Sequence, residues 1–245
     1  MKVLSVALQK GGVGKSTTAT AVAACLGNMG HKTLLVDMDM QANSTYISSP
    51  NEPEHTITDA LVGDATVQEA IIPCAYYDLL PADQFLSNVE KADMPVNLLS
   101  SILAPIANNY DFCIIDTPPS LGTLLKASLI SSDYVLIPID ARPLAIKGID
   151  ALQETLTAVQ AVHPLKILGI VLTRYNDRSI LNRQLKDVLT QRASDLGTSL
   201  FRTYIHDSVS VPESQAMQMP LLDYAPKAKP TLDYAALTGA ILERM

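Results

Sequence analysis

The residues from Lys10 to Thr17 have the types and the order that a triphosphate site requires. They read Lys-Gly-Gly-Val-Gly-Lys-Ser-Thr and come directly after the apolar run at 3–8. Glycines let backbone N–H groups close around a polyphosphate, and the start of a helix adds a partial positive charge. In such a loop Lys15 binds the β- and γ-phosphates, and the Ser16 hydroxyl is a ligand of Mg²⁺. The predicted phosphate loop consists of Gly11, Gly12, Val13, Gly14, Lys15, Ser16 and Thr17.

This loop departs from the usual phosphate-binding pattern. The pattern G-x-x-x-x-G-K-[ST] has glycine at position 9, where this chain has Gln9, and a second lysine, Lys10, follows. A plain strand-to-helix connection would explain the glycines but not the two lysines that flank them. We therefore predict a site for a nucleoside triphosphate and Mg²⁺.

Aspartates follow two apolar segments farther along the chain. Asp37 and Asp39 come after residues 33–36, and Asp116 comes after residues 112–115. In an open parallel sheet, ligands bind beyond the carboxyl ends of the strands, so these carboxylates are expected beside the phosphates. The alternative is that strand-end aspartates only cap the next helix. For Asp37 a structural role and a place in the Mg²⁺ shell both remain open.

Parallel strands alternating with helices are needed to bring these segments together. Strands are predicted over 2–8, 32–37, 77–80, 112–116, 134–139, 167–172 and 201–205. Helices are predicted over 16–28, with Gly30 closing it, and over 57–62, 67–72, 97–108, 121–130, 145–162, 180–196 and 231–244. Residues 38–55 are expected to form an irregular loop over the nucleotide. This order predicts a doubly wound α/β fold, a mostly parallel sheet flanked by helices, in one domain spanning residues 1–245.

Composition agrees with one domain of this kind. Apolar residues make up 48% of the 245, and no run approaches the roughly eighteen apolar residues of a membrane-spanning helix. The chain begins directly with a strand, so no signal peptide is expected. Cys25, Cys74 and Cys113 form no C-x-x-C pair and are expected to be reduced thiols, which counts against an iron–sulfur site.

Charge is distributed unevenly along the sequence. Residues 37–93 carry a net charge of −10, whereas the rest of the chain carries +3. The overall charge of −7 does not suggest nucleic-acid binding by bulk charge, so any DNA binding requires a local basic patch.

The segment from Lys10 to Thr17 resembles the deviant Walker A loop of the ParA/MinD family of dimeric ATPases. Three more segments resemble that family in the expected order. They are residues 36–41 (its D-x-D-P-Q segment, with Met40 in place of proline), 112–120 (its Walker B strand and Thr-Pro-Pro turn) and 171–176 (its base-side segment). The resemblance covers nearly the whole chain and implies ATP and Mg²⁺ as ligands.

The resemblance also implies roles for single residues. Lys10 is implied to cross a homodimer interface and touch the phosphates of the partner subunit, while Lys15 binds phosphate within its own subunit. Asp39 is implied to position the attacking water, and Asp116 to hold the hydration shell of Mg²⁺ together with Ser16. Catalysis is thereby assigned to Lys10, Lys15 and Asp39.

On the base side, the resemblance places Arg174 and Asn176 near the nucleotide base. The alternative is an ordinary exposed loop. Residues 205–209, Ile-His-Asp-Ser-Val, occupy the place of the family's I-P-R-N-V segment, so His206 replaces a proline and the usual arginines are missing. We expect His206 to be partly exposed and structurally neutral, and not a catalytic base.

ParA relatives hold nonspecific DNA with basic residues on the C-terminal side of the dimer. Here residues 174–202 carry a net charge of +3, and the candidate DNA-binding residues are Arg178, Arg183 and Lys186. A weak, salt-dependent interaction is expected, and the alternative is an ordinary solvated helix face. No helix-turn-helix precedes the first strand, so specific operator binding by an N-terminal domain is not expected.

The function predicted from these features is that of a partition ATPase. It would dimerise on ATP, bind nonspecific DNA, and be released when a ParB-like adaptor or another small partner stimulates hydrolysis. A cytoplasmic, nucleoid-associated location is expected. The alternatives are a MinD-like or protein-cargo positioning ATPase acting without DNA, and a metabolic P-loop enzyme. Residues 231–245 lack the basic face that anionic lipid requires, so no membrane binding is expected.

Overall fold

Seven strands form one sheet in the computed structural model, which describes residues 1–92, 94–142 and 146–245. The strand order is β3-β4-β2-β5-β1-β6-β7, and every pair is parallel except β3 with β4. The strands are β1 (Lys2–Val6), β2 (Thr33–Asp37), β3 (Ile72–Pro73), β4 (Asp78–Leu80), β5 (Phe112–Asp116), β6 (Tyr134–Asp140) and β7 (Lys166–Thr173). The predicted doubly wound α/β class is confirmed.

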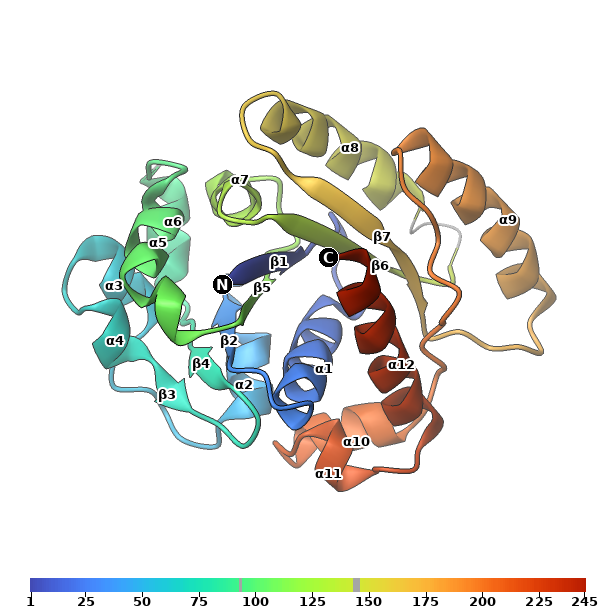
Figure 1. Cartoon of the computed structure of the whole chain (residues 1–245), viewed down its shortest axis with the longest axis horizontal. Coiled ribbons are helices and arrows are strands. Elements are labelled where there is room, and N and C mark those ends of the chain that lie inside the picture. Colours follow the sequence, from blue (N-terminus) through green and yellow to red (C-terminus); the bar gives the residue numbers. More distant parts are fainter. Residues whose placement is uncertain (93, 143–145) are drawn as a thin grey trace.

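Helices cover both faces of this sheet (Figure 1). Helices α1 and α12 pack together on one face, and α7 and α8 lie on the other. The helices are α1 (Lys15–Asn28), α2 (Asn43–Ser48), α3 (Ile57–Val62), α4 (Val67–Ala70), α5 (Leu86–Lys91), α6 (Leu98–Leu103), α7 (Thr123–Ile130), α8 (Ile146–Gln160), α9 (Ile180–Asp195), α10 (Ser210–Ala216), α11 (Leu221–Tyr224) and α12 (Lys229–Arg244). None of the helices in the described part of the chain is long and apolar enough to cross a membrane.

The central strands are buried on both faces, which explains their unbroken apolar sequences. Leu34, Leu35 and Val36 of β2 are fully buried, as are Ile114 and Ile115 of β5. Burying each such side chain stabilises the fold by about 1.5–3 kcal/mol. The register of these two strands places Asp37 directly beside Asp116, so two apolar runs end in a pair of neighbouring carboxylates.

Helix α1 ends as the sequence predicts. Gly30 has a left-handed φ of 91°, its N–H donates to Gly27 O at 2.9 Å, and the His31 N–H donates to Leu26 O at 3.1 Å. This pair of bonds is a Schellman motif, in which glycine adopts the left-handed conformation without a Cβ penalty.

Three predicted segments differ from the observed ones. Residues 38–55 contain the helix α2, so the segment after β2 is not irregular throughout. The helix predicted over 97–108 divides into α6 and a 3₁₀ helix, Ala104–Asn109, whose second residue is Pro105. Residues 201–205 do not form a strand; the nearby chain makes only single bridges to β7 and the residues after it, at Leu200 and His206.

Several short elements were not predicted. They are the helices α2, α5, α10 and α11 and the strand β3, none longer than seven residues. Segments this short contain too few residues to show a clear apolar period. The helix predicted from Ala145 is observed from Ile146, and Ala145 itself lies outside the described residues.

Candidate active site

The loop between β1 and α1 has the backbone shape of a phosphate cradle. Gly12 and Gly14 have left-handed φ values of 72° and 89°, which residues with a side chain rarely adopt. Gly14 is the N-cap of α1, and no side chain caps this helix end or places an acidic group in its first turn. The N–H groups and the positive end of a 14-residue helix are therefore free to meet an anion at this loop.

Lys15 is the first residue of α1, and its buried side chain contacts the loop. Its Nζ donates to Lys10 O at 3.0 Å, and only 6% of the residue is exposed. Burial lowers the pKa of Lys15, and the nearby carboxylates of Asp116 and Asp39 partly offset this effect. The ammonium group is thus held beside the loop with few polar partners of its own, which suits it to a phosphate oxygen.

Asp37 organises the segment that follows β2. Its Oδ2 accepts from the Thr45 N–H at 2.8 Å and from Thr45 Oγ1 at 2.9 Å, while its Oδ1 accepts from the Asp39 N–H at 3.1 Å. Burial, followed by the charge of Asp116, raises the pKa of Asp37 to about 8. Both oxygens hold backbone in place, so the geometry favours the structural role over a place in a metal shell.

One carboxylate oxygen of Asp116 accepts a hydrogen bond, and the other has no partner among the described residues. Its Oδ2 accepts from Ser44 Oγ at 2.8 Å, whereas the fully buried Oδ1 has no hydrogen-bond partner among the described residues. Burial raises the pKa of Asp116 to about 6, against the opposing effects of the Ser16 and Ser44 hydroxyls and of Lys15. A buried carboxylate oxygen without a partner fits the hydration shell of Mg²⁺, which accepts few direct protein ligands.

Asp39 lies close to this pair and is 5% exposed. Its Oδ1 accepts from the Gln41 N–H at 3.1 Å, and Ala42, three residues later, has a φ of 50°. Burial raises the pKa of Asp39, and the charge of Lys15 lowers it. The chain therefore turns sharply after Asp39 into α2, the helix whose Ser44 and Thr45 bind the other two carboxylates.

The side chain of Lys10 contacts a carboxylate of its own chain. Its Nζ lies 3.4 Å from Asp140 Oδ1 at the end of β6, with 26% of the lysine side chain exposed. The other oxygen of Asp140 lies 3.0 Å from Arg142 Nε. Asp140 is 2% exposed, so this buried carboxylate holds Lys10 beside the phosphate loop.

A cavity of about 360 Å³ adjoins the phosphate loop at Gly14 and Thr17. Arg174, His206 and Tyr234 are among the other residues that line it. Arg174 has a φ of 51°, a strained backbone of the kind that clusters at binding sites. Asn176 is not among the lining residues; its Oδ1 instead accepts from the Arg178 N–H at 3.0 Å.

His206 is partly exposed, as predicted, but it is not isolated. Its ring contacts carboxylates of Asp177 and Asp233, and its edge meets the Tyr175 ring with centroids 5.8 Å apart. The expectation of a structurally neutral residue is therefore too simple, because the ring joins three parts of the chain.

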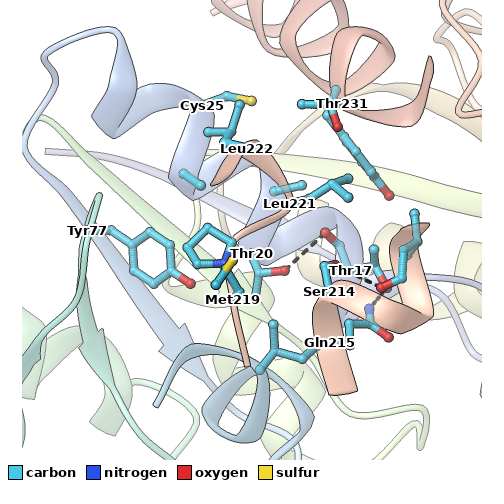
Figure 2. Close-up of a pocket in the computed structure, with 16 residues that line it drawn as sticks. Thr17, Thr20, Cys25, Tyr77, Ser214, Gln215, Met219, Leu221, Leu222 and Thr231 are labelled. Atoms are coloured by element: carbon cyan, nitrogen blue, oxygen red, sulfur yellow. Dashed lines mark hydrogen bonds between the residues drawn. The ribbon is translucent and has the colours of Figure 1, made fainter. Parts of the chain in front are cut away.

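Four residues around the loop were missed in the sequence. Ser44 and Thr45 belong to the unpredicted α2, and Gln215 belongs to the unpredicted α10. Figure 2 shows Gln215 beside Thr17, where its Nε2 donates to Thr17 Oγ1 at 2.8 Å next to an apolar pocket. Thr173, at the end of β7, donates from Oγ1 to Val13 O at 2.8 Å. Only Thr173 carried a signal, since it ends an apolar strand.

The basic residues predicted to bind DNA are exposed on one helix and the turn before it. Arg183 and Lys186 lie three residues apart on α9, and Arg178 precedes that helix. Lys186 Nζ lies 5.2 Å above the centre of the Tyr204 ring. Arg192 is instead paired with Asp150 at 3.4 Å and with Asp195 at 3.9 Å. The available positive charge is therefore smaller than the sequence total suggests.

Similarity to known proteins extends over almost all of the chain. A family model described as an AAA domain matches residues 1–167. The chromosome partitioning protein ParA of Myxococcus xanthus is 34% identical over 99% of this chain and 88% of its own length. The cell division ATPase MinD of Pyrococcus furiosus has a TM-score of 0.82 at 26% identity, covering 99% of this chain and 98% of its own. A cobyrinic acid a,c-diamide synthase from Mycobacterium smegmatis with bound ADP and magnesium has a TM-score of 0.85 at 29% identity, covering 99% and 94%.

Proposed function

This chain is an ATPase of the ParA/MinD family, and we propose that it uses ATP to close a homodimer that partitions DNA. Sequence similarity favours partition, because the relative from Myxococcus xanthus is a chromosome partitioning protein. The synthase and the MinD structure share the fold over the whole chain, but neither is as similar in sequence.

In the proposed reaction the protein positions groups around the triphosphate. The loop glycines and the start of α1 hold the phosphates, and Lys15 neutralises their charge. Ser16 and Asp116 would hold Mg²⁺, which when bound neutralises charge on the phosphate oxygens. Asp39 accepts a hydrogen bond from the attacking water and orients it. Positioning and electrostatics of this kind account for most of the catalysis in phosphoryl transfer.

The observation that carries the dimer proposal is the position of Lys10. Its Nζ contacts Asp140, while the buried ammonium group of Lys15 donates to Lys10 O within the phosphate loop. Lys10 is thus a second cation beside the loop, and its side chain is partly exposed. We propose that it swings outward and reaches the phosphates of the partner subunit when ATP is bound.

Two variants separate this role from general phosphate binding. Lys10→Ala is expected to bind ATP but to remain monomeric with a non-hydrolysable ATP analogue, because only the contact across the dimer is removed. Lys15→Ala is expected to weaken nucleotide binding itself. Light scattering measures the dimer and calorimetry measures the affinity. Dimerisation of Lys10→Ala at the wild-type level would contradict the interface assignment.

For DNA, we propose that the closed dimer presents Arg178, Arg183 and Lys186 of both subunits to nonspecific duplex. A ParB-like adaptor or another small partner then stimulates hydrolysis and releases the dimer. The protein would act in the cytoplasm, on the nucleoid. Two observations support this proposal. The three side chains are exposed, and none of them forms an ion pair within the described ranges.

The test measures duplex binding with ATP, with ADP and without nucleotide, at about 50 and 200 mM salt. Wild type should bind unrelated duplexes alike with ATP, and binding should fall steeply with salt. The reversal Arg183→Glu/Lys186→Glu should abolish binding and spare ATPase activity. Lys2→Glu/Lys32→Glu, which makes the same charge change at exposed residues where β1 and β2 begin, is the matched control. No binding by wild type with ATP at low salt would favour a MinD-like or protein-cargo positioning ATPase instead.

A further inference from the structure

The ring of His206 lies between two carboxylates that come from different parts of the chain. Asp233 belongs to α12, and Asp177 belongs to the loop between β7 and α9. We infer that His206 is a positioning residue, which joins these two elements and thereby fixes the wall of the cavity that receives the nucleotide base. The inference rests on the proposed nucleotide site, with the base in the cavity beside Arg174.

The contact with Asp233 anchors both the backbone and the ring of His206. Asp233 Oδ2 accepts from the His206 backbone N–H at 3.0 Å, and His206 Nδ1 lies 2.7 Å from the same oxygen. Both side chains are about 15% exposed, so water competes weakly for these bonds. Residue 206 therefore cannot shift relative to α12 without losing two bonds to one carboxylate.

The contact with Asp177 ties the same ring to the loop that carries Arg174. His206 Nε2 lies 3.1 Å from Asp177 Oδ2, and Lys229 Nζ of α12 lies 3.1 Å from that same oxygen. The backbone continues the connection, since the Tyr175 N–H donates to Ile205 O at 2.9 Å and the Asp207 N–H donates to Tyr175 O at 3.1 Å. The loop, residues 205–207 and α12 are thus linked at one place by the imidazole, by Lys229 and by two backbone hydrogen bonds.

Both ring nitrogens of His206 have carboxylate partners, Asp233 at Nδ1 and Asp177 at Nε2. Lys229 adds a cation beside Asp177. Hydrogen bonds to a charged group are among the stronger ones in proteins.

Because both ring nitrogens are occupied, His206 has none left to bind the base. Its contribution to the cavity is a rigid wall, close to Arg174 and Tyr234. A rigid wall lowers the entropy cost of ordering the cavity on binding. Its loss should therefore lower the affinity for nucleotides, which carry a base, and leave the affinity for a ligand made of phosphates alone unchanged.

The experiment compares Mg²⁺-ADP with Mg²⁺-pyrophosphate by calorimetry, using the full chain. ADP avoids the proposed ATP dimer, so the result does not depend on dimerisation. His206→Ala should bind ADP about tenfold more weakly, the loss expected from one charge-assisted bond, and should bind pyrophosphate like wild type. General destabilisation would weaken both ligands alike, so a loss confined to ADP distinguishes the positioning role from it.

Asp177→Asn is the second variant, because Asp177 is 62% exposed and its loss does not threaten the fold. It should lower the affinity for ADP less than His206→Ala does, because an amide oxygen still accepts a hydrogen bond from His206 Nε2. Asp187→Asn, which removes an exposed carboxylate from α9, is the control and should change the affinity for neither ligand. Wild-type ADP affinity in His206→Ala, or an equal loss for pyrophosphate, would overturn the inference. If wild type bound ADP no tighter than pyrophosphate, the base site itself would be wrong, and the inference with it.

Discussion

Replacing Asp140 by asparagine should strengthen the ATP-dependent dimer, because Asp140 holds Lys10 inside its own subunit. The two charges are 3.4 Å apart, and at an effective dielectric constant near 20 this corresponds to a raw attraction of about 5 kcal/mol. The net contribution of the Lys10–Asp140 pair is smaller, about 1 kcal/mol. It is reduced by solvent at the partly exposed lysine, by the side-chain entropy lost when the lysine is held, and by competition from Arg142.

Each dimer requires two such lysines to leave their carboxylates. The net gain for Asp140→Asn is therefore about 2 kcal/mol per dimer, or about a 30-fold tighter dimer. Asparagine has nearly the same shape as aspartate, so the end of β6 should keep its structure. Light scattering or sedimentation with a non-hydrolysable ATP analogue, over a range of protein concentrations, measures the dimer dissociation constant.

Two further variants make the test specific for Lys10. Arg142→Gln removes the other ion pair of Asp140 without freeing Lys10, and it should not tighten the dimer. In a Lys10→Ala background, Asp140→Asn should have no effect, because no lysine remains to be released. A weaker dimer in Asp140→Asn, or a gain that persists without Lys10, would show that Asp140 does not restrain Lys10.

Two other predictions concern the carboxylates at the ends of the strands. Asp39→Ala should still bind ATP and dimerise but should lose about 10²–10⁴-fold in partner-stimulated phosphate release; near-normal turnover would mean that another group orients the water. Burial raises the pKa of Asp37 to about 8, so between about pH 4 and 8 the native state binds a proton that the unfolded chain releases, and stability due to this group falls as the pH rises. Urea unfolding should therefore show wild type losing more than about 1 kcal/mol relative to Asp37→Asn between about pH 5.5 and 8, and a difference that does not change with pH would contradict this assignment.

The sequence predicted the elements that carry the phosphate loop and the carboxylates, because these are long apolar strands with distinctive residues at their ends. β5 was predicted with its observed bounds, and Asp37, Asp39 and Asp116 lie together as expected from parallel strands. The residues that hold these groups could not be predicted. Ser44, Thr45 and Gln215 belong to helices of six or seven residues, where the pattern is too short to read.

Contacts between residues far apart in the sequence could not be predicted either. Lys10 meets Asp140 and His206 meets Asp233, and nothing in the local sequence of either partner indicates the other. Such contacts depend on the order of strands in the sheet and on the path of the C-terminal segment. The pairing of Arg192 with Asp150 of another helix could not be predicted for the same reason.

The separation of charge along the sequence becomes a separation in space. Helices α3, α4 and α5, from the stretch with a net charge of −10, lie at one end of the molecule, and α9 with Arg183 and Lys186 lies at the other (Figure 1). The molecule is consequently an electric dipole along its long axis. Near any polyanion, the field exerts a torque that turns α9 inward and the acidic end outward before contact. Even a patch too weak to hold the protein tightly can thus determine which face arrives first.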